Sequence, residues 1–413
     1  MQKCLIIGKV WPEPASSAAG TRMMQLIGLF VENGLEVIFG SAAGATAHSF
    51  PLSETGVKTI VLPLNDPACD EILKNIEPDL VVFDRFTSEE QFGWRVAINC
   101  PRAIRVLDTE DLHGLRAAGE EEIKTGKRPA DTVNDVLLRE VASISRCDLS
   151  LIISDHEMDV LTGRLKVPAS QLCYIPFLFD QVSPSQAAKL PPYNKRSGFV
   201  FAGNFLHAPN RDSVFYLREQ IWPLIVKQMP AARVNIYGPY ADRKVTSLHD
   251  PGEGFYIMGR AIMIDEVMQA ARVSLAPLRF GAGLKGKIAD SLRCGTPCVT
   301  TGTGAQGMGG AESWPGAIAN EPEKFAAAAV ELHQSETKWT DASRSCTERF
   351  NVIFDGKKDG ARLMRTLTGL LTHLGAHREN NFTGAMLMHQ TIHASRWLAR
   401  FIEIKNAKTK SIN

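Results

Sequence analysis

Glycines and lysines are concentrated in one short segment, GAGLKGKI at residues 281–288, which we call the glycine loop. Its three glycines match the dinucleotide-binding pattern G-x-G-x-x-G. Gly281, Gly286 and Lys287 also match most of the P-loop pattern G-x-x-x-x-G-K. Both patterns bind phosphate through backbone amides at the start of a helix, where the helix dipole is positive. The loop therefore predicts an anion site late in the chain.

Neither pattern is complete. A P-loop needs a Ser or Thr hydroxyl after the lysine to bind magnesium, and that position is Ile288. A dinucleotide fingerprint follows the first strand of its domain, and an acidic residue ends the next strand. The strand that we predict after this loop ends instead in Thr300 and Thr301.

The local chemistry still suits a nucleoside diphosphate. Arg279, Lys285 and Lys287 supply cations beside free amides, and Asp290 can accept bonds from ribose hydroxyls. The alternative is a tight turn whose charges form a solvated face.

Short apolar runs that predict buried strands alternate with segments of helical periodicity. The runs in the first half are 4–8, 35–40, 59–64, 79–84, 103–108 and 149–154. Those in the second half are 198–203, 233–238, 255–259, 273–278 and 297–301. The pattern predicts an α/β fold with two tandem doubly wound, Rossmann-like domains and a ligand cleft between them. We expect domains at 1–185 and 186–370, joined by the proline-rich stretch 181–196.

Composition limits the classes of function. The formal net charge of +1 argues against a large nucleic-acid footprint. The eight cysteines form no C-x-x-C pair, so we expect no metal site and interpret them as buried residues of a cytoplasmic protein. We expect neither a signal peptide nor a membrane span.

The C-terminal extension, residues 371–413, is predicted to be helical. It contains the apolar-periodic segment AMLMHQTIHASRWLARFIEI and several basic residues. We expect it to pack back on the N-terminal domain. The alternative is an interfacial helix that makes peripheral contact with the inner face of a membrane.

Three segments together carry a family resemblance. Residues 279–308 closely resemble the donor-site segment of group 1 retaining glycosyltransferases, which have the GT-B fold. Residues 199–214 resemble the first β-α unit of the same domain, and residues 11–30 resemble the N-terminal loop and helix that face the donor diphosphate. The resemblance extends, in order, over roughly residues 1–370. It implies a nucleotide-sugar donor bound by the C-terminal domain and a glycan or glycolipid acceptor on the N-terminal side. It also implies retention of anomeric configuration, with no metal and no separate cofactor.

The resemblance assigns roles within the C-terminal domain. Many members carry two glutamates separated by seven residues, and here these positions are Ala282 and Asp290. The ribose-binding acid is therefore kept, while the first acid is missing, so backbone amides must serve the sugar. The expected donor-binding residues outside the catalytic set are Ser17, Ala19, Gly20, Asn204, Gly259, Arg260, Arg279, Gly281, Ala282, Gly283, Leu284, Lys285, Lys287 and Asp290.

The candidate catalytic residues come from the N-terminal domain. Asp84 and Asp108 end two predicted strands, and His113 follows in the segment DTEDLHG. Relatives often have a histidine at such positions, near the donor sugar. Each residue has an alternative role as a helix cap or surface ion pair.

Three functions compete at this stage. The leading hypothesis is a retaining glycosyltransferase. The second is a nucleotide-dependent oxidoreductase that uses the glycine fingerprint. The third is a non-catalytic GT-B-like protein that binds nucleotides or sugars, which the loss of the first glutamate would permit.

Overall fold

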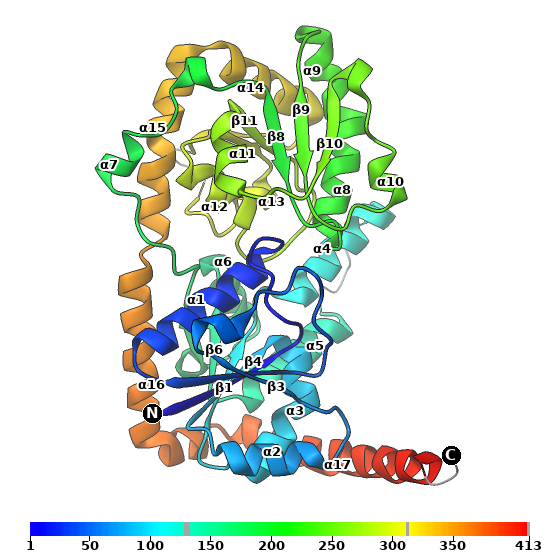
Figure 1. Ribbon diagram of the computed structural model, residues 1–413, viewed down its shortest axis with the longest axis vertical. Coiled ribbons are helices and arrows are strands. Elements are labelled where there is room, and N and C mark those ends of the chain that lie inside the picture. Colours follow the sequence, from blue (N-terminus) through cyan, green and yellow to red (C-terminus); the bar gives the residue numbers. More distant parts are fainter. Residues whose placement is uncertain (128–132, 311–313, 411–413) are drawn as a thin grey trace.

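Two parallel β-sheets form the two halves of the molecule in the computed structural model, which describes residues 1–127, 133–310 and 314–410 (Figure 1). The first sheet has seven strands in the order β3-β2-β1-β4-β5-β6-β7, and the second has six in the order β10-β9-β8-β11-β12-β13. Both orders reverse direction beside the first strand, as in doubly wound folds, so the predicted α/β architecture is confirmed.

The inner strands of the N-terminal sheet are buried on both faces, whereas the edge strand β3 is mostly exposed. Its strands are β1 (Lys3–Gly8), β2 (Glu36–Ser41), β3 (Lys58–Val61), β4 (Leu80–Asp84), β5 (Ile104–Asp108), β6 (Leu149–Ile152) and β7 (Leu172–Tyr174). Its helices are α1 (Ala18–Glu32), α2 (Ala68–Ile76), α3 (Arg85–Asn99), α4 (His113–Thr125), α5 (Asp135–Arg146) and α6 (Asp155–Asp159). A π-helical turn at 160–164 continues α6. The central strand β4 is wholly buried, which explains its unbroken apolar sequence LVVF.

The C-terminal sheet repeats this design. Its strands are β8 (Phe199–Ala202), β9 (Val234–Tyr237), β10 (Phe255–Gly259), β11 (Val273–Ala276), β12 (Cys298–Thr300) and β13 (Gly316–Ile318). The helices from the linker onward are α7 (Pro184–Ala187), α8 (Ala208–Tyr216), α9 (Trp222–Gln228), α10 (Arg243–Thr246), α11 (Ile264–Ala270), α12 (Gly286–Arg293), α13 (Gly302–Ala305), α14 (Pro322–Gln334) and α15 (Glu336–Ile353). All eight cysteines are free and buried, as expected for small apolar residues.

The chain then returns to the N-terminal half through α16 (Gly356–Glu379) and α17 (Phe382–Lys410) (Figure 1). Leu363 and Leu367 of α16 belong to the N-terminal core, so this return begins before residue 370, where we expected the C-terminal domain to end. Arg378 fixes the end of α16 by bonding Asp148 at 2.7 Å. Helix α17 packs against α3 and α5.

Candidate active site

The carboxyl ends of the strands in both sheets meet in the cleft between the domains. There Asn204 Nδ2 donates to the carbonyl of Ser16 at 3.2 Å. The hydroxyl of Tyr240 donates to Glu13 Oε2 at 2.7 Å. Loops after β8 and β9 thus contact the loop after β1. The expected role of Asn204 in donor binding stays a prediction.

The glycine loop connects β11 to α12 and lies against the N-terminal domain. Gly283 has φ +61°, and a Cβ built there would lie 2.8 Å from Cβ of Asp111. A Cβ on Gly286 would lie 2.6 Å from Cβ of Ala18. These glycines let the two domains approach closely, a requirement that the motif patterns do not express.

A carboxylate from the N-terminal domain binds the backbone of this loop. Glu157 of α6 is fully buried, and its Oε1 accepts the amides of Leu112 at 2.8 Å and Gly283 at 2.9 Å. Burial raises the pKa of Glu157 to about 7, against the lowering effect of Lys285. Sequence reasoning missed this residue because it lies 126 positions before Gly283.

Lys285 and Lys287 are the cations at the inner side of the loop. Lys285 Nζ donates to the carbonyl of Gly283 at 2.8 Å, and burial lowers the pKa of this lysine to about 8. Lys287 bonds Asn210 and lies 4.7 Å from the ring centroid of Phe201, and burial lowers its pKa to about 7. An arriving anion would stabilise the charged form of both lysines.

Arg279 faces α8 instead. Its Nε donates to Asp212 at 2.9 Å, and its guanidinium lies 4.9 Å from the ring centroid of Tyr216. The sequence left open which of the three cations points inward. In this structure Lys285 is buried and lines the interdomain cavity, Lys287 is half-buried, and the charge of Arg279 is paired with Asp212.

The remaining positions of the loop anchor or line the site. Leu284 packs in a core cluster with Ile288, which fixes the backbone that precedes α12. Gly281 and Ala282 line an interdomain cavity. Because the first acid of the family pattern is replaced by alanine at residue 282, Gly281 and Ala282 offer a ligand only their main-chain polar groups.

Asp290 lies in α12 beside two other charged residues. Its Oδ1 accepts from Arg293 at 3.1 Å, and Arg293 also bonds Asp265 of α11 at 2.6 Å. Burial raises the pKa of Asp290 to about 6, although Arg293 acts in the opposite direction. Its ribose-binding role stays a prediction, and ribose would have to share the carboxylate with Arg293.

The side chain of Ser17 caps the start of α1. Ser17 Oγ accepts the amide of Gly20 at 3.0 Å, so that amide is engaged by the helix cap. A Cβ on Gly20 would lie 2.4 Å from the carbonyl carbon of Glu13, which explains why glycine stands there. Ala19, the third predicted residue, is half-buried in the first turn.

Gly259 and Arg260 follow β10 on the rim of the C-terminal sheet. Gly259 has φ +73°, and its carbonyl accepts the amide of Gly238 at 2.7 Å. Arg260 is exposed, and so are the apolar side chains of Met258 and Ile262 on either side. The base-binding role expected for Gly259 and Arg260 stays a prediction.

Asp108 does not present a free carboxylate to the cleft. It is fully buried, and both its oxygens accept from Nε of Arg22, at 2.9 and 3.1 Å. Arg22 also bonds the carbonyl of Ile175 at 2.8 Å. The expected catalytic role of Asp108 therefore competes with a structural one, which ties α1 to the end of β5.

Asp84 and His113 each have close polar neighbours. Asp84 Oδ2 accepts the amide of Lys9 at 3.0 Å, while its buried Oδ1 lies 3.6 Å from Arg85 Nε. His113 Nε2 lies 3.1 Å from Asp111 Oδ1, and burial lowers the pKa of this histidine. Glu140 caps the amide of His113 at 2.7 Å, so this end of α4 is already occupied.

Glu110 is a second residue that the sequence analysis did not select. It is buried with φ +62°, and its Oε1 has no hydrogen-bond partner among the described residues. Burial, reinforced by Asp108, raises the pKa of Glu110 well above its ordinary value. The segment DTED signals acidity, but no local pattern reveals the left-handed backbone. Such strain and lack of pairing are typical of functional positions.

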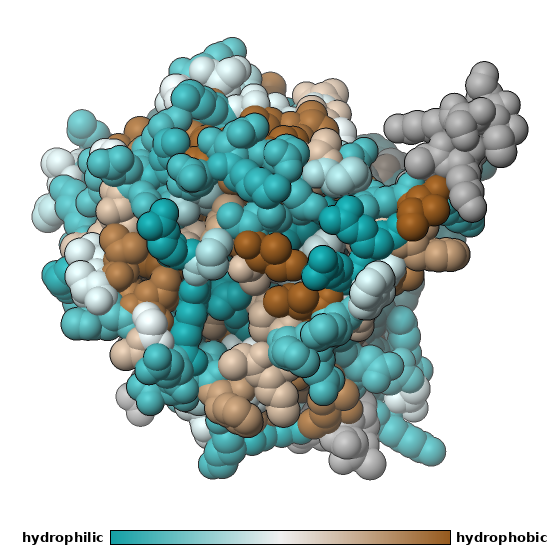
Figure 2. All heavy atoms as spheres, turned by 90° about the horizontal axis from the view of Figure 1, so that it is seen from below, coloured by the Kyte–Doolittle hydropathy of each residue, from teal (hydrophilic) through white to brown (hydrophobic). Residues whose placement is uncertain are grey.

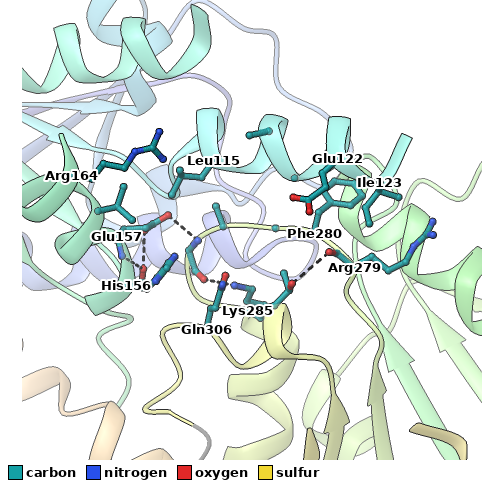
Figure 3. A pocket seen from close by; sticks show the side chains of 18 residues that line it. Leu115, Glu122, Ile123, His156, Glu157, Arg164, Arg279, Phe280, Lys285 and Gln306 are labelled. Carbon is teal, nitrogen blue, oxygen red and sulfur yellow. Dashed lines mark hydrogen bonds between the residues drawn. The ribbon is translucent and has the colours of Figure 1, made fainter. Parts of the chain in front are cut away.

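A cavity of about 390 Å³ opens beside the glycine loop (Figure 3). Helix α4, the segment 154–164 and the loop form most of its wall. Its labelled residues are Leu115, Glu122, Ile123, His156, Glu157, Arg164, Arg279, Phe280, Lys285 and Gln306. Apolar surface with a few polar groups is typical of a small-molecule site. Across the three described ranges, no group of three or more His, Cys, Asp or Glu residues is arranged to hold a metal ion.

Comparisons with known proteins agree with this architecture. Residues 196–335 match the family model described as Glycosyl transferases group 1. An uncharacterized protein of the cps region of Klebsiella pneumoniae is 23% identical over 229 residues, covering 52% of this chain. The matched region spans about half of that relative, 54% of its length.

Solved structures match over nearly the whole chain. HepE of Anabaena in complex with UDP-glucose is 14% identical with a TM-score of 0.66, covering 90% of this chain and 100% of HepE. Sucrose-phosphate synthase of Thermosynechococcus elongatus is 16% identical with a TM-score of 0.65, over the same shares. WaaG, a glycosyltransferase involved in lipopolysaccharide biosynthesis, is 12% identical with a TM-score of 0.60, covering 89% of this chain and 100% of WaaG. The predicted GT-B fold and the resemblance to group 1 glycosyltransferases are confirmed.

Proposed function

We propose that this protein is a retaining glycosyltransferase. It would move a sugar from a nucleoside-diphosphate donor to a hydroxyl of a glycan or glycolipid, without a metal or a separate cofactor. The observation that carries the proposal is the buried ammonium of Lys285, with half-buried Lys287 beside it, in a glycine loop that closes on the opposite domain. Burying a cation is costly unless an anion accompanies it.

The donor fits the C-terminal side of the cleft. Its diphosphate would meet the two lysines and the first amides of α12, which together stabilise the negative charge that grows on the leaving phosphate. Asp290 would bind the ribose, and the rim at Gly259 and Arg260 would take the base. The acceptor hydroxyl would enter through the cavity beside α4, and Asp84 or His113 would orient it.

Nucleotide binding is the first experimental test. Thermal unfolding is measured with UDP, GDP, ADP and CMP, and the matching base should raise the unfolding temperature by several degrees. At a hundredfold excess over Kd, binding adds about 2.7 kcal/mol to the free energy of unfolding. UDP is tried first because HepE was solved with UDP and with UDP-glucose.

Transfer itself is then assayed with sugars on the nucleotide that binds. The cps-region relative makes bacterial surface glycans the first acceptors to test. NMR of the anomeric proton in the earliest product reports whether configuration is retained. Inversion would refute the retaining mechanism while leaving nucleotide binding intact.

Two alternatives give different results in the same assays. A non-catalytic binding protein would bind nucleotide sugar and never release its sugar, even slowly to water. An oxidoreductase would bind NADH, for which the sequence offers only the incomplete fingerprint at the glycine loop.

A further inference from the structure

Helix α17 has two apolar faces, and the fold uses one of them. Met388 and Ala399 are buried where α17 packs on the N-terminal domain. Six of the eighteen exposed large apolar side chains of the described residues lie elsewhere on this helix. They are Phe382, Met386, Trp397, Leu398, Phe401 and Ile404, with Trp397 exposed by 69% and Phe401 by 66%.

The exposed residues form a stripe opposite the buried face. At 3.6 residues per turn, Trp397, Phe401 and Ile404 fall within about one sixth of the helix circumference. Met388 and Ala399 lie on the other side by the same count. An aromatic and aliphatic stripe of this kind is unusual for a surface that meets only water.

Positive charge accompanies the stripe. Among the residues of α17 whose side chains the structure describes, three are basic and one is acidic, a net of +2, in a chain whose net charge is +1. The acid, Glu403, is compensated by Arg95 at 2.8 Å and by Arg400 at 2.8 Å. Arg396 and Arg400 are exposed beside the stripe. The surface is therefore apolar and basic at once.

We propose that the outward face of α17 docks on a bilayer that contains anionic phospholipids, with the helix lying in the plane of the interface. Trp, Phe and Leu on one face with Lys and Arg around them is the composition of interfacial helices. Each basic residue near an anionic surface strengthens binding by about fivefold. No helix in the described part of the chain is long and apolar enough to cross a membrane, so surface docking is the mode that the composition supports.

A second copy of the chain fits this face less well. In a twofold dimer the same patch meets itself, and two helix faces of net positive charge would be brought together. Juxtaposed like charges oppose association, whereas anionic headgroups complement them. Charge therefore selects the lipid surface as the occupant.

The docking face lies away from the cleft. Arg378, just before α17, bonds the carbonyl of Ala103 at 2.7 Å and Asp148, at the amino ends of β5 and β6. The candidate site lies at the carboxyl ends of these strands. Seen from below, apolar side chains lie in several separate patches among polar ones (Figure 2). Docking thus leaves the cleft open, and the inference does not rest on the proposed function.

Vesicle flotation with the full chain tests the inference. Vesicles of phosphatidylcholine are compared with vesicles in which about a third of the lipid is phosphatidylglycerol. We expect binding to be at least about tenfold stronger with the anionic lipid, and weaker as salt shortens the Debye length. The variant Trp397→Glu with Phe401→Glu should lose this binding. Val352→Glu, at a side chain 80% exposed on α15, is the matched control and should bind like the wild type.

Three results would overturn the inference. One is equal binding to neutral and anionic vesicles, and another is unchanged binding of the double variant. The third is a wild-type dimer that the double variant dissociates, with no vesicle binding by either. An unchanged thermal unfolding temperature in the double variant shows that a loss of binding comes from the surface and not from unfolding.

Discussion

Replacing Lys285 by methionine removes one buried charge while keeping the length of the side chain. The ammonium of Lys285 donates to the carbonyl of Gly283 at 2.8 Å. A diphosphate in the cleft would give this buried charge an anionic partner. Lys285→Met should therefore weaken nucleotide binding without removing the loop.

The magnitude follows from the burial of this lysine. Loss of one partner from a desolvated charge pair costs ~2–5 kcal/mol. Lys287 remains in the variant and still opposes the phosphates, so we expect the lower part of this range. A loss of about 2–3 kcal/mol corresponds to roughly 30- to 150-fold in Kd.

The pH dependence of binding has a definite sign. Burial lowers the pKa of Lys285 to about 8 in the free protein, and a bound diphosphate raises it again because it stabilises the ammonium. Below pH 8 Lys285 is already charged, so its own protonation contributes little to the pH dependence of binding there. Above pH 8 binding must take up a proton, so wild-type affinity should fall as pH rises, and Lys285→Met should lose this part of the dependence.

Calorimetric titration with the nucleoside diphosphate measures both effects. Lys324→Met is the matched control, because its side chain is 76% exposed on the same domain. Its Kd should equal that of the wild type. An unchanged Kd in both Lys285→Met and Lys287→Met would refute the assignment of the diphosphate to the glycine loop.

Five further predictions concern the same cleft. Asp290→Asn should weaken ribonucleotides by ~1.5–3 kcal/mol and leave 2′,3′-dideoxynucleotides unaffected, which paired titrations would check. Transfer activity should survive EDTA because lysines and backbone amides stabilise the negative charge of the leaving diphosphate. Loss of activity in EDTA that Mg²⁺ restores would contradict this. Asp108→Ala should lower the free energy of unfolding, measured in urea, by ~3–5 kcal/mol, since it leaves Arg22 buried without its carboxylate partner. Asp84→Asn should instead lower kcat about 10²-fold while the nucleotide affinity stays unchanged. Glu110→Gln should stabilise the fold at neutral pH. The pKa of Glu110 is raised in the folded state, so the wild type loses stability as pH rises above the ordinary value of 4.5. Equal urea midpoints for the wild type and the variant at both pH 4 and pH 7 would exclude this.

The strands were predictable because burial on both faces leaves a local signal. Every predicted run overlaps a strand, with bounds that differ by at most three residues, and the run 255–259 coincides with β10. The two strands without a prediction, β7 and β13, have three residues each and lie at sheet edges. So short a strand has no periodicity to detect, and its position depends on the neighbour that it pairs with.

The site was less predictable because its geometry joins residues that are far apart in the sequence. The sequence identified Lys285 as a cation of the loop, but Arg279 looked equivalent until Asp212, 67 residues earlier, was seen to pair with it. Asp108 looked like a strand-end acid of the cleft, yet Arg22, 86 residues earlier, holds it in the core. Residue type and local spacing identified the chemistry, whereas long-range pairing decided which groups remain available for it.

The carboxylate at the glycine loop shows why local patterns are insufficient here. The loop has alanine at residue 282, so the motif alone describes a site without an acid. Glu157 of the opposite domain nevertheless bonds the amide of Gly283 and lines the same cavity. Because Glu157 also bonds Leu112, one side chain joins the loop to the start of α4. Any opening of the cleft must break the bond to Gly283, so the conformation of the glycine loop depends on how the two domains are placed.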